Sequence, residues 1–561
     1  MSRCFLDDSS LELALPQATY SALWALWRHC DEAEAREAVP CQQLAAVRQA
    51  LVKWALLRSL VPLYARASFS HSGDLFVASS IWTDGLGDYF ALLRAAGALQ
   101  RRHSGIKVHV IFHHKQQLPS VDVAQFHLRP EQIHPFYEGE NPLTHVLKPI
   151  IEGKETLPFE ERYRQLVSER ASDIASQFAR ESKGLQHSSA LDSCIQDASA
   201  EIAALTPYFA IQEQARVLRK KMEGALAIVH IALALDTFSD SILKPKSLYF
   251  AESGNFQGME NSFALNWYSM GLNPFEEGLF LPISKHGKGE WNSPLLSRLW
   301  EQKSLSTGSF HLGYFNQQQA DAARLFLYLT CCRVHPGEPS SLVLLMPIAA
   351  LEALALDIPW LASQQIKQII HQKSDGTEKR YAIASQGRDL FLINCFPVTS
   401  QDFIRLIKES GPVVGCTGDG SLGECLAAGK LVFYEVRRHK MQTYQGLLEL
   451  ARFYGTKSPL LLQYLQAVAQ IDQSRSPEER ALFLAQLLEE PLLFDAWREV
   501  TKAISLYFDF EEALLGRVAR HLLLSQDSSL RQKEEKAIQE YICGSSSRAA
   551  VASSLERSLG L

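Results

Sequence analysis

The spacing of hydrophobic residues divides the chain into helical ends and a middle in which short strands and helices alternate. Residues 10–68 place apolar side chains three and four positions apart, a spacing that predicts helices. The pattern changes at Asp74, where DLFVASS is short, apolar and bounded by turn residues, as in a buried strand. A glycine-containing loop, the helical run YFALLRAAGALQRR and the strand-like GIKVHVIFHH follow it. This order is a βαβ unit and implies a parallel sheet.

Further strands and helices are expected in two groups. The apolar runs ALAIVHIA, SLYFAES and GLFLPI complete the first sheet, after a polar helical insertion. A second alternating series follows a Gly/Ser/Asn-rich region. Its expected strands are FHLGYF, SLVLLMP, RDLFLINC, PVVGCT and LVFYEV, and its expected helices are QQADAARLFLYLTCC, AALEALALDIPWLASQQIKQIIHQ, SQDFIRLIKES and a short one after PVVGCT.

The pattern predicts an α/β protein with two Rossmann-like domains that face a cleft, and with helical N-terminal, inserted and C-terminal segments. Ligands of open α/β sheets bind outside the carboxyl ends of the strands, and two glycine-rich loops fall at such ends. The expected units are a helical N-terminal extension (1–70), a first Rossmann-like domain (71–295) with a helical insertion at about 155–225, a second Rossmann-like domain (305–450) and a C-terminal helical region (451–561).

Composition narrows the function classes. The 561 residues carry a net charge of −6, which argues against a general nucleic-acid binder. The ten cysteines include no C-x-x-C pair, so we expect no zinc motif, no disulfide framework and a reducing, cytoplasmic location. The most apolar stretch, ALAIVHIALALDTF, is shorter than the roughly 20 residues that span a bilayer. The N-terminus lacks the basic and apolar regions of a signal peptide.

The segment GCTGDGSLGECLAAGKLVFYE, from Gly415 to Glu435, has a structural and a functional interpretation. Ser421 and Glu424 are spaced as a capping box at a helix start, which needs no ligand. The glycines before them would expose backbone N–H groups at that helix start. Such a position binds anions, so a phosphate or diphosphate is the expected guest.

The same segment also fits the dinucleotide fingerprint. Gly418, Gly420 and Gly423 have the G-x-G-x-x-G spacing, and Glu435 ends the next strand, where a ribose-binding acid would lie. This interpretation predicts an NAD(P)-dependent oxidoreductase. The fingerprint normally sits on the first strand of its domain, whereas here it comes late.

The loop resembles the nucleotide-sugar loop of GT-B glycosyltransferases, G-x-x-S-x-x-E-A-x-x-x-G-x-P, which lies late in their C-terminal domain. The resemblance implies that Gly420 and Ser421 contact the donor diphosphate and that Glu424 contacts ribose or sugar hydroxyls. Gly418 and Asp419 belong to the same donor-binding loop.

The chain departs from the family pattern at two positions and resembles the family in one further loop. Cys425 stands where Ala is usual, and Leu431 stands where Pro is usual. The family likeness also implies that the loop after FHLGYF, with Tyr314 and Asn316, faces the donor.

The loop WTDGLGDYF supplies the expected catalytic residues. In the structural interpretation, Asp88 caps the helix that starts at Tyr89 and Asp84 shapes the turn. In the functional one, Gly85 and Gly87 let a ligand approach the backbone, and an aspartate acts as general base. The loop resembles the D-x-x-x-D loop of some inverting GT-B enzymes, including protein-arginine rhamnosyltransferases. That resemblance implies Asp84 as the base and Asp88 as its support.

We therefore expect a glycosyltransferase that moves a sugar from a nucleotide-sugar donor to an acceptor, without a metal or further cofactor. The chain has no D-x-D pair of the metal-dependent GT-A enzymes. The alternatives are the oxidoreductase and a non-catalytic GT-B-like protein-binding scaffold. The helical additions favour a protein acceptor, and the Glu-rich, then Ser-rich C-terminus resembles the tails of bacterial effectors secreted into host cells.

Overall fold

The computed structural model describes most of the chain in separate stretches. Asp84, Gly85 and most of the predicted insertion lie outside them. The described residues are 56–67, 72–81, 87–103, 105–114, 121–137, 217–232, 242–251, 267–273, 276–282, 290–302, 305–316, 320–333, 341–348, 350–437, 440–469 and 475–561, with a few more between 168 and 196.

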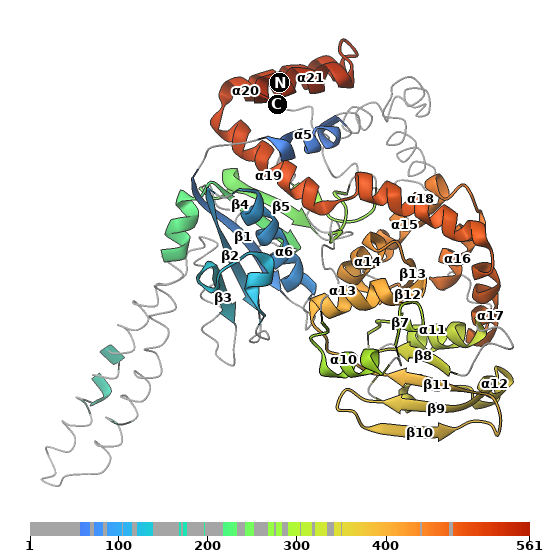
Figure 1. Cartoon of the computed structure of the whole chain (residues 1–561). Helices are drawn as coiled ribbons and strands as arrows, with labels where there is room; N and C mark the ends of the chain where they lie inside the picture. The colour runs from blue at the N-terminus through green and yellow to red at the C-terminus, as the bar shows by residue number, and fades with distance from the viewer. Residues whose placement is uncertain are drawn as a thin grey trace, which may run out of the picture.

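The first sheet has six parallel strands in the order β3-β2-β1-β4-β5-β6 (Figure 1). Leu75 and Val77 of β1 face α6 and α19, whereas Phe76 and Ala78 pack with Met222 on the opposite face. Burial on both faces explains why these strands read as continuous apolar runs. The elements are β1 (Gly73–Ile81), α6 (Gly87–Arg102), β2 (Ile106–His114), β3 (Ile133–Tyr137), β4 (Ala227–Ala232), β5 (Ser247–Ala251) and β6 (Trp267–Ser269), with short 3₁₀ turns at Val123–Phe126, Pro130–Gln132 and Lys244–Lys246.

The second sheet has seven strands in the order β10-β9-β11-β8-β7-β12-β13, of which β10 alone is antiparallel to its neighbour. Its elements are α10 (Pro294–Glu301), β7 (His311–Gly313), α11 (Ala320–Cys332), β8 (Ser341–Leu345), a 3₁₀ turn (Leu351–Leu354), α12 (Ile358–Ser363), β9 (Ile366–Gln372), β10 (Glu378–Ala382), β11 (Arg388–Ile393), α13 (Ser400–Glu409), β12 (Val413–Thr417), α14 (Gly418–Ala427) and β13 (Leu431–Glu435).

Each sheet has a switch point, the place where the chain leaves a central strand in one direction and later returns to its other side. In the first sheet it lies between β1 and β4, and in the second between β7 and β12. Open α/β sheets bind their ligands at the carboxyl ends of the strands beside this point.

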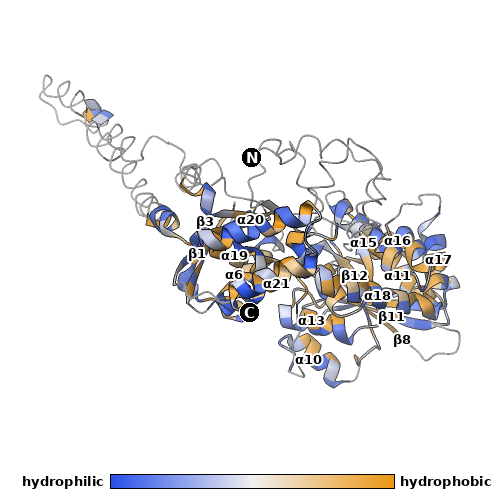
Figure 2. Ribbon diagram, turned by 90° about the horizontal axis from the view of Figure 1, so that it is seen from above, coloured by the Kyte–Doolittle hydropathy of each residue, from blue (hydrophilic) through white to orange (hydrophobic). Residues whose placement is uncertain are grey.

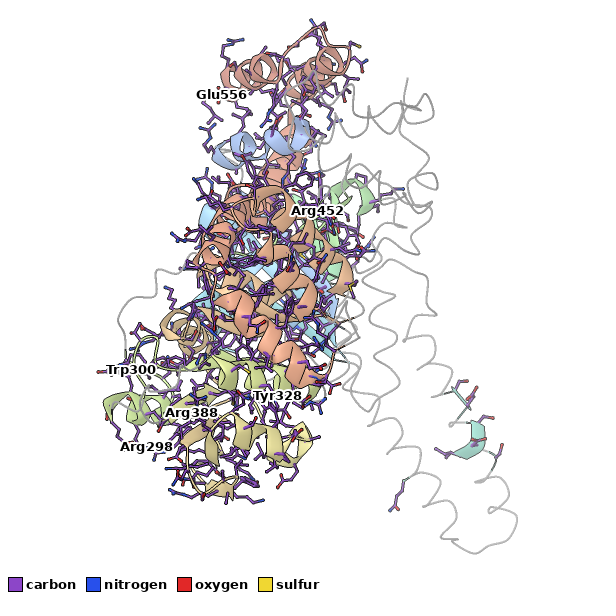
Figure 3. All side chains as sticks on the ribbon, turned by 90° about the vertical axis from the view of Figure 1, so that its right-hand side faces the viewer. Arg298, Trp300, Tyr328, Arg388, Arg452 and Glu556 are labelled. Atoms are coloured by element: carbon purple, nitrogen blue, oxygen red, sulfur yellow. The ribbon has the colours of Figure 1, made fainter. Side chains whose placement is uncertain are left out.

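Polar side chains fasten α11 to its neighbours in the second domain. The Tyr328 hydroxyl accepts a hydrogen bond from the Asp357 backbone N–H at 2.7 Å, and Arg388 Nη2 donates to the Cys331 carbonyl at 2.7 Å. Figure 3 labels Tyr328 and Arg388 in the lower part of the molecule, with Glu556 of the last helix at the opposite end.

The C-terminal helices pack on both domains. Helices α15 to α18 share the hydrophobic core of the second sheet, α19 packs on the first sheet, and α20 and α21 pack with the N-terminal α5. Figure 2 shows hydrophobic and hydrophilic residues along these helices, as expected for elements with one buried face. Their bounds are α5 (Val61–Arg66), α15 (Met441–Tyr454), α16 (Leu460–Val468), α17 (Pro477–Leu488), α18 (Pro491–Tyr507), α19 (Phe510–Gln526), α20 (Ser528–Ile542) and α21 (Arg548–Leu559).

The chain returns to the first domain beside the segment 276–282. Leu279 donates its N–H to the Phe508 carbonyl at 3.0 Å, and Phe510 donates to the Leu279 carbonyl at 3.0 Å. A side chain at Gly278 would place Cβ 2.1 Å from the Phe508 carbonyl oxygen, and φ there is +102°. Only glycine fits both requirements.

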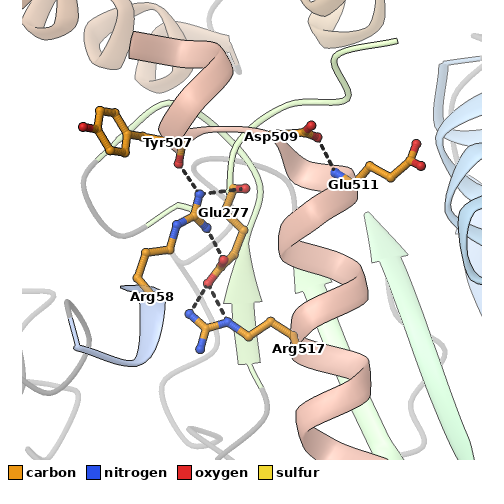
Figure 4. Close-up of polar contacts among 6 residues, drawn as sticks. All are labelled: Arg58, Glu277, Tyr507, Asp509, Glu511 and Arg517. Carbon is orange, nitrogen blue, oxygen red and sulfur yellow. Dashed lines mark hydrogen bonds and ion pairs between the residues drawn. The ribbon is translucent and has the colours of Figure 1, made fainter. Parts of the chain in front are cut away.

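A buried ion cluster lies where the chain returns to the first domain, beside the segment 276–282 (Figure 4). Glu277 is fully buried and accepts two hydrogen bonds from Arg517 on α19, at 2.7 and 3.1 Å. Arg58, just before α5, pairs with its other carboxylate oxygen. Burial raises the pKa of Glu277, but the two guanidinium groups outweigh it, so the pKa lies below its usual value. The cluster joins the N-terminal helix, the segment 276–282 and α19.

Most expected strands and helices are confirmed, with instructive exceptions. The predicted helix over 349–372 is wrong: α12 ends at Ser363, Gln365 turns with φ +60°, and IKQIIHQ forms β9. Its β-branched residues pair with β11, so tertiary contacts override the helical spacing. GLFLPI contributes isolated bridges instead of a strand, and β3, β6 and β10 were not predicted. In the part of the chain that the structure describes, no helix is long and apolar enough to cross a membrane.

Candidate site at the two switch points

The helices that follow the two switch points touch each other. Helix α6 follows β1 of the first sheet, and α14 follows β12 of the second. Arg94 on α6 donates from Nη2 to Oε1 of Glu424 on α14. Burial raises the pKa of Glu424, and the Arg94 charge only partly opposes it. An ion pair therefore joins the two helices that begin where Rossmann-like sheets bind ligands.

Helix α14 starts directly at the end of β12. Thr417 ends the strand, and Gly418 opens the helix with φ +73°, a conformation that favours glycine. A Cβ at Gly418 or Gly420 would meet no atom of the described residues within 4 Å, and Gly420 is exposed. These glycines leave the first turn of the helix open to solvent, where the orphan N–H groups of a helix lie.

The predicted capping box is wrong because α14 begins three residues before Ser421. The Ser421 hydroxyl bonds to the backbone of Thr417, accepting from its N–H at 3.2 Å and donating to its carbonyl. Glu424 points to Arg94 instead of the helix start. The side chain of Ser421 is thus engaged within the first turn, and its predicted diphosphate contact stays a prediction.

Charged side chains surround the start of α14. Lys440 Nζ lies 2.8 Å from Asp419 Oδ2. Glu435, at the end of β13, accepts from the Asn316 backbone N–H at 2.9 Å, and Arg437 Nε lies 3.5 Å from its other oxygen. Two carboxylates and two cations therefore lie at the second switch point, where they can bind both hydroxyls and phosphates.

Several buried polar atoms at these strand ends have no hydrogen-bond partner among the described residues. Buried polar groups are almost always satisfied, by protein, water or ligand. The atoms at the end of β12 and β13 are Thr417 Oγ1, Asp419 Oδ1, Tyr434 Oη and Glu435 Oε1. The carboxyl ends of β12 and β13 thus present buried polar atoms to which a bound molecule could form hydrogen bonds.

Tyr314 follows β7 on the other side of the switch point. Its ring packs on Phe396 and Phe403, with centroids 5.3 and 4.8 Å away. Burial raises the pKa of Tyr314, and the Glu424 charge adds to that effect. Tyr314 therefore lies near the Arg94–Glu424 pair. That Tyr314 faces the donor stays a prediction.

Of the loop expected to carry the catalytic residues, the structure describes only the last part, from Gly87 onward. Gly87 is the exposed first residue of α6, and Asp88 lies half-buried in the first turn, where a carboxylate interacts favourably with the helix dipole. Asp84 and Gly85 lie outside the described residues. The roles of Asp84 and Asp88 stay predictions. Among the residues that the structure describes, no group of three or more His, Cys, Asp or Glu side chains could hold a metal ion.

The third glycine of the fingerprint has an unexpected neighbour. A Cβ at Gly423 would lie 2.2 Å from the carbonyl oxygen of Phe280, in the segment that leads out of the first domain. In the dinucleotide fingerprint this glycine allows the helix to pack closely on its own sheet. Here it allows contact between the domains, which weakens the dinucleotide interpretation.

Sequence reasoning missed Arg94. The one available signal was a single charge inside the apolar run YFALLRAAGALQ of α6. An isolated arginine on a buried helix usually has an acidic partner, but the partner comes from another domain and cannot be read from the sequence.

The sequence matches no family model and no curated protein. Solved structures are similar in fold. A putative UDP-N-acetylglucosamine 2-epimerase from Listeria monocytogenes is 11% identical and covers 79% of this chain and 94% of its own, with a TM-score of 0.36. A Thermobaculum terrenum O-GlcNAc transferase is 12% identical, and the match covers 91% of this chain and 83% of the transferase, with a TM-score of 0.31. TcCGT1 in complex with UDP is 10% identical, and the match covers 78% of this chain and 100% of TcCGT1, with a TM-score of 0.25.

These TM-scores lie below 0.5, so the fold assignment rests on the two strand orders and not on the superpositions. Two doubly wound sheets, each with its own switch point, confirm the predicted pair of Rossmann-like domains.

Proposed function

We propose that the chain is a glycosyltransferase that moves a sugar from a nucleotide-sugar donor to an acceptor where its two domains meet. One observation carries this proposal. Arg94 and Glu424 join the helices that follow the switch points of both sheets. A donor bound at one switch point and an acceptor bound at the other would therefore lie close together, as transfer requires.

The donor diphosphate would bind at the amino terminus of α14. The first N–H groups of the helix and its dipole favour an anion there, and Gly418 and Gly420 leave room for it. Lys440 and Arg437 are cations at the same strand ends, each paired with a carboxylate. Fixed donors of this kind would stabilise the charge on the departing diphosphate, so the proposed reaction needs no metal.

The acceptor would bind at the first switch point. Asp84 is proposed to take the proton from the acceptor nucleophile, with Asp88 as its support. The helical additions favour a protein acceptor, because they supply surface beyond the two Rossmann-like domains.

Two rivals make different predictions. A nicotinamide oxidoreductase would use Gly418, Gly420 and Glu435, and the position of Glu435 at the end of β13 is the observation that favours it. A binding scaffold would use neither loop for chemistry.

The test is the release of nucleoside phosphate from UDP-, GDP-, dTDP-, ADP- and CMP-sugars, with and without EDTA. NAD(P)H oxidation is followed in parallel. We expect release from one donor, insensitive to EDTA and strongly reduced in Asp84→Asn. Hydride transfer without donor turnover would favour the oxidoreductase. No turnover of any compound, with or without candidate acceptor proteins, would contradict the proposal.

A matched pair of variants localises the donor. Gly420→Trp adds a large side chain in open space at the start of α14, so it should block turnover without disturbing the fold. Gly224 is also exposed, with no atom within 4 Å of its Cβ position and no positive φ. Gly224 precedes β4, at the amino ends of the strands and so opposite the carboxyl ends where the substrates are proposed to bind, and Gly224→Trp should leave turnover unchanged.

A further inference from the structure

Glu435 is placed to reach across the second switch point. It is the last residue of β13 and pairs in register with Thr417, the last residue of β12. Its Oε2 accepts the Asn316 backbone N–H at 2.9 Å, and Asn316 follows β7 on the far side of β12. The carboxylate therefore passes over the end of β12. Its side chain is 3% exposed.

The other oxygen of this carboxylate accepts no hydrogen bond from the residues that the structure describes. Glu435 Oε1 is buried and has no hydrogen-bond partner among the described residues. Arg437 Nε lies 3.5 Å away, but it makes no hydrogen bond either. A charged, buried oxygen without a donor is costly, so a group that donates to it would bind with a large gain.

The neighbouring atoms suit a hydroxyl. Thr417 Oγ1 and Tyr434 Oη are also buried without a partner in the described part of the chain, and each can donate a hydrogen bond. A ligand hydroxyl can donate to Glu435 Oε1 and accept from such a group at the same time. A phosphate could not donate, and it would be repelled by the carboxylate.

Glu424 is less suited to the same task. Its carboxylate is paired with Arg94 from the other domain and lies in the middle of α14. Glu435 lies beside Thr417, the residue directly before the proposed diphosphate site at the start of α14. The ribose is the part of a nucleotide sugar that is attached to the diphosphate on the nucleoside side.

We propose that Glu435 Oε1 accepts a hydrogen bond from a ribose hydroxyl of the donor, so that Glu435, and not Glu424, selects the ribose. This inference rests on the proposed donor site. It adds a residue that the glycosyltransferase resemblance does not assign, and it leaves Glu424 as a contact between the domains.

The test compares nucleotides that differ by one hydroxyl. Dissociation constants are measured by calorimetry for UDP, GDP, ADP, CDP and dTDP, and then for the 2′-deoxy and 3′-deoxy forms of the tightest of them, or for the 3′-deoxy form and the ribonucleotide if that is dTDP. Loss of a hydrogen bond to a charged group should weaken one deoxy form by about tenfold or more. This comparison on the unaltered protein needs no variant and does not depend on folding.

The variant Glu435→Gln then tests whether Glu435 causes the difference in affinity between the parent nucleotide and its deoxy form. The amide keeps the side-chain shape and can still accept the Asn316 N–H. We expect the parent nucleotide to bind this variant about as weakly as the deoxy form binds the unaltered protein, with little difference left between the two. Glu424→Gln should retain the difference, as should Glu378→Gln on the remote strand β10.

Three results would overturn the inference. Equal binding of the parent and both deoxy forms to the unaltered protein would exclude the hydroxyl contact. A difference that persists in Glu435→Gln, or that disappears in Glu424→Gln instead, would assign the contact elsewhere. In these cases nucleotide binding itself, and with it the proposed function, would stand. If no nucleoside diphosphate binds the unaltered protein, both proposals fall.

Discussion

Arg94 on α6 and Glu424 on α14 form an ion pair between the two Rossmann-like domains. Their side chains are 18% and 6% exposed, so the pair is largely removed from water. Tyr314 lies close enough for the Glu424 charge to raise its pKa. The pair thus links the two helices that follow the switch points by one polar contact.

Removal of Arg94 should destabilise the protein by about 3 kcal/mol, the low end for a buried pair that loses one partner, because Arg94 keeps some exposure. Arg94→Met would leave Glu424 as a buried carboxylate without a counter-charge. Adding Glu424→Gln should recover part of the loss. Denaturant unfolding of the single and double variants measures the coupling. A double variant whose loss of stability equals the sum of the two single losses would show that the pair contributes no coupling.

Arg517 should matter far more than a surface arginine. Arg517→Met leaves Glu277 fully buried with Arg58 alone, so we expect a loss of about 3–5 kcal/mol. Arg498, 72% exposed and paired with Asp495, is the matched control (Arg498→Met), with an expected change within about 1 kcal/mol. Thermal unfolding of both variants would decide. Similar small losses in the two would mean that the buried cluster is not required for stability.

Gly423 should be intolerant of a methyl group, whereas Gly420 should accept one. Gly423→Ala would place Cβ 2.2 Å from the Phe280 carbonyl and should cost about 1–3 kcal/mol through forced displacement. Gly420→Ala enters open space, and its effect should stay within about 1 kcal/mol. Equal stability of the two variants, measured side by side in urea, would contradict the close approach of the domains at Gly423.

Asp509 should make stability depend on pH. It caps α19, and burial, with the Glu511 and Glu512 charges, raises the pKa of Asp509 to about 6 from 3.8. Between these values the folded protein holds a proton that the unfolded chain releases, so this group's contribution to stability falls as pH rises.

Asp509→Asn isolates that contribution. Asparagine caps helices as well as aspartate but carries no charge. The variant should match the unaltered protein near pH 4 and become the more stable of the two above pH 6. Melting curves across this range measure the difference, and a gap independent of pH would show that Asp509 does not titrate as stated.

The fold was largely predictable from the sequence because parallel strands buried on both faces leave continuous apolar runs, as in β1 and β12. The short β6 and the antiparallel β10 leave no such run, and exposed, charged β10 follows a turn out of β9. The switch from α12 to β9 depends on pairing with β11, which lies later in the chain.

The site was predictable to the level of its loops but not of its contacts. Glycine density located the start of α14, because backbone exposed at a strand end requires small residues. The partners of Glu424 and Glu435 could not be predicted, since Arg94 and Asn316 are distant in the sequence and meet these residues only after the domains fold. Asp84 and Gly85 were named from the sequence alone.

The most direct test of the account is nucleotide binding at the start of α14, measured by thermal shift. A nucleoside diphosphate at 100 times its Kd should stabilise the protein by roughly 2.7 kcal/mol. We predict that one nucleoside diphosphate raises the melting temperature of the unaltered protein and of Gly224→Trp, but not of Gly420→Trp. An equal shift in Gly420→Trp, or a shift with NAD(H) or NADP(H) alone, would contradict a donor site at this helix.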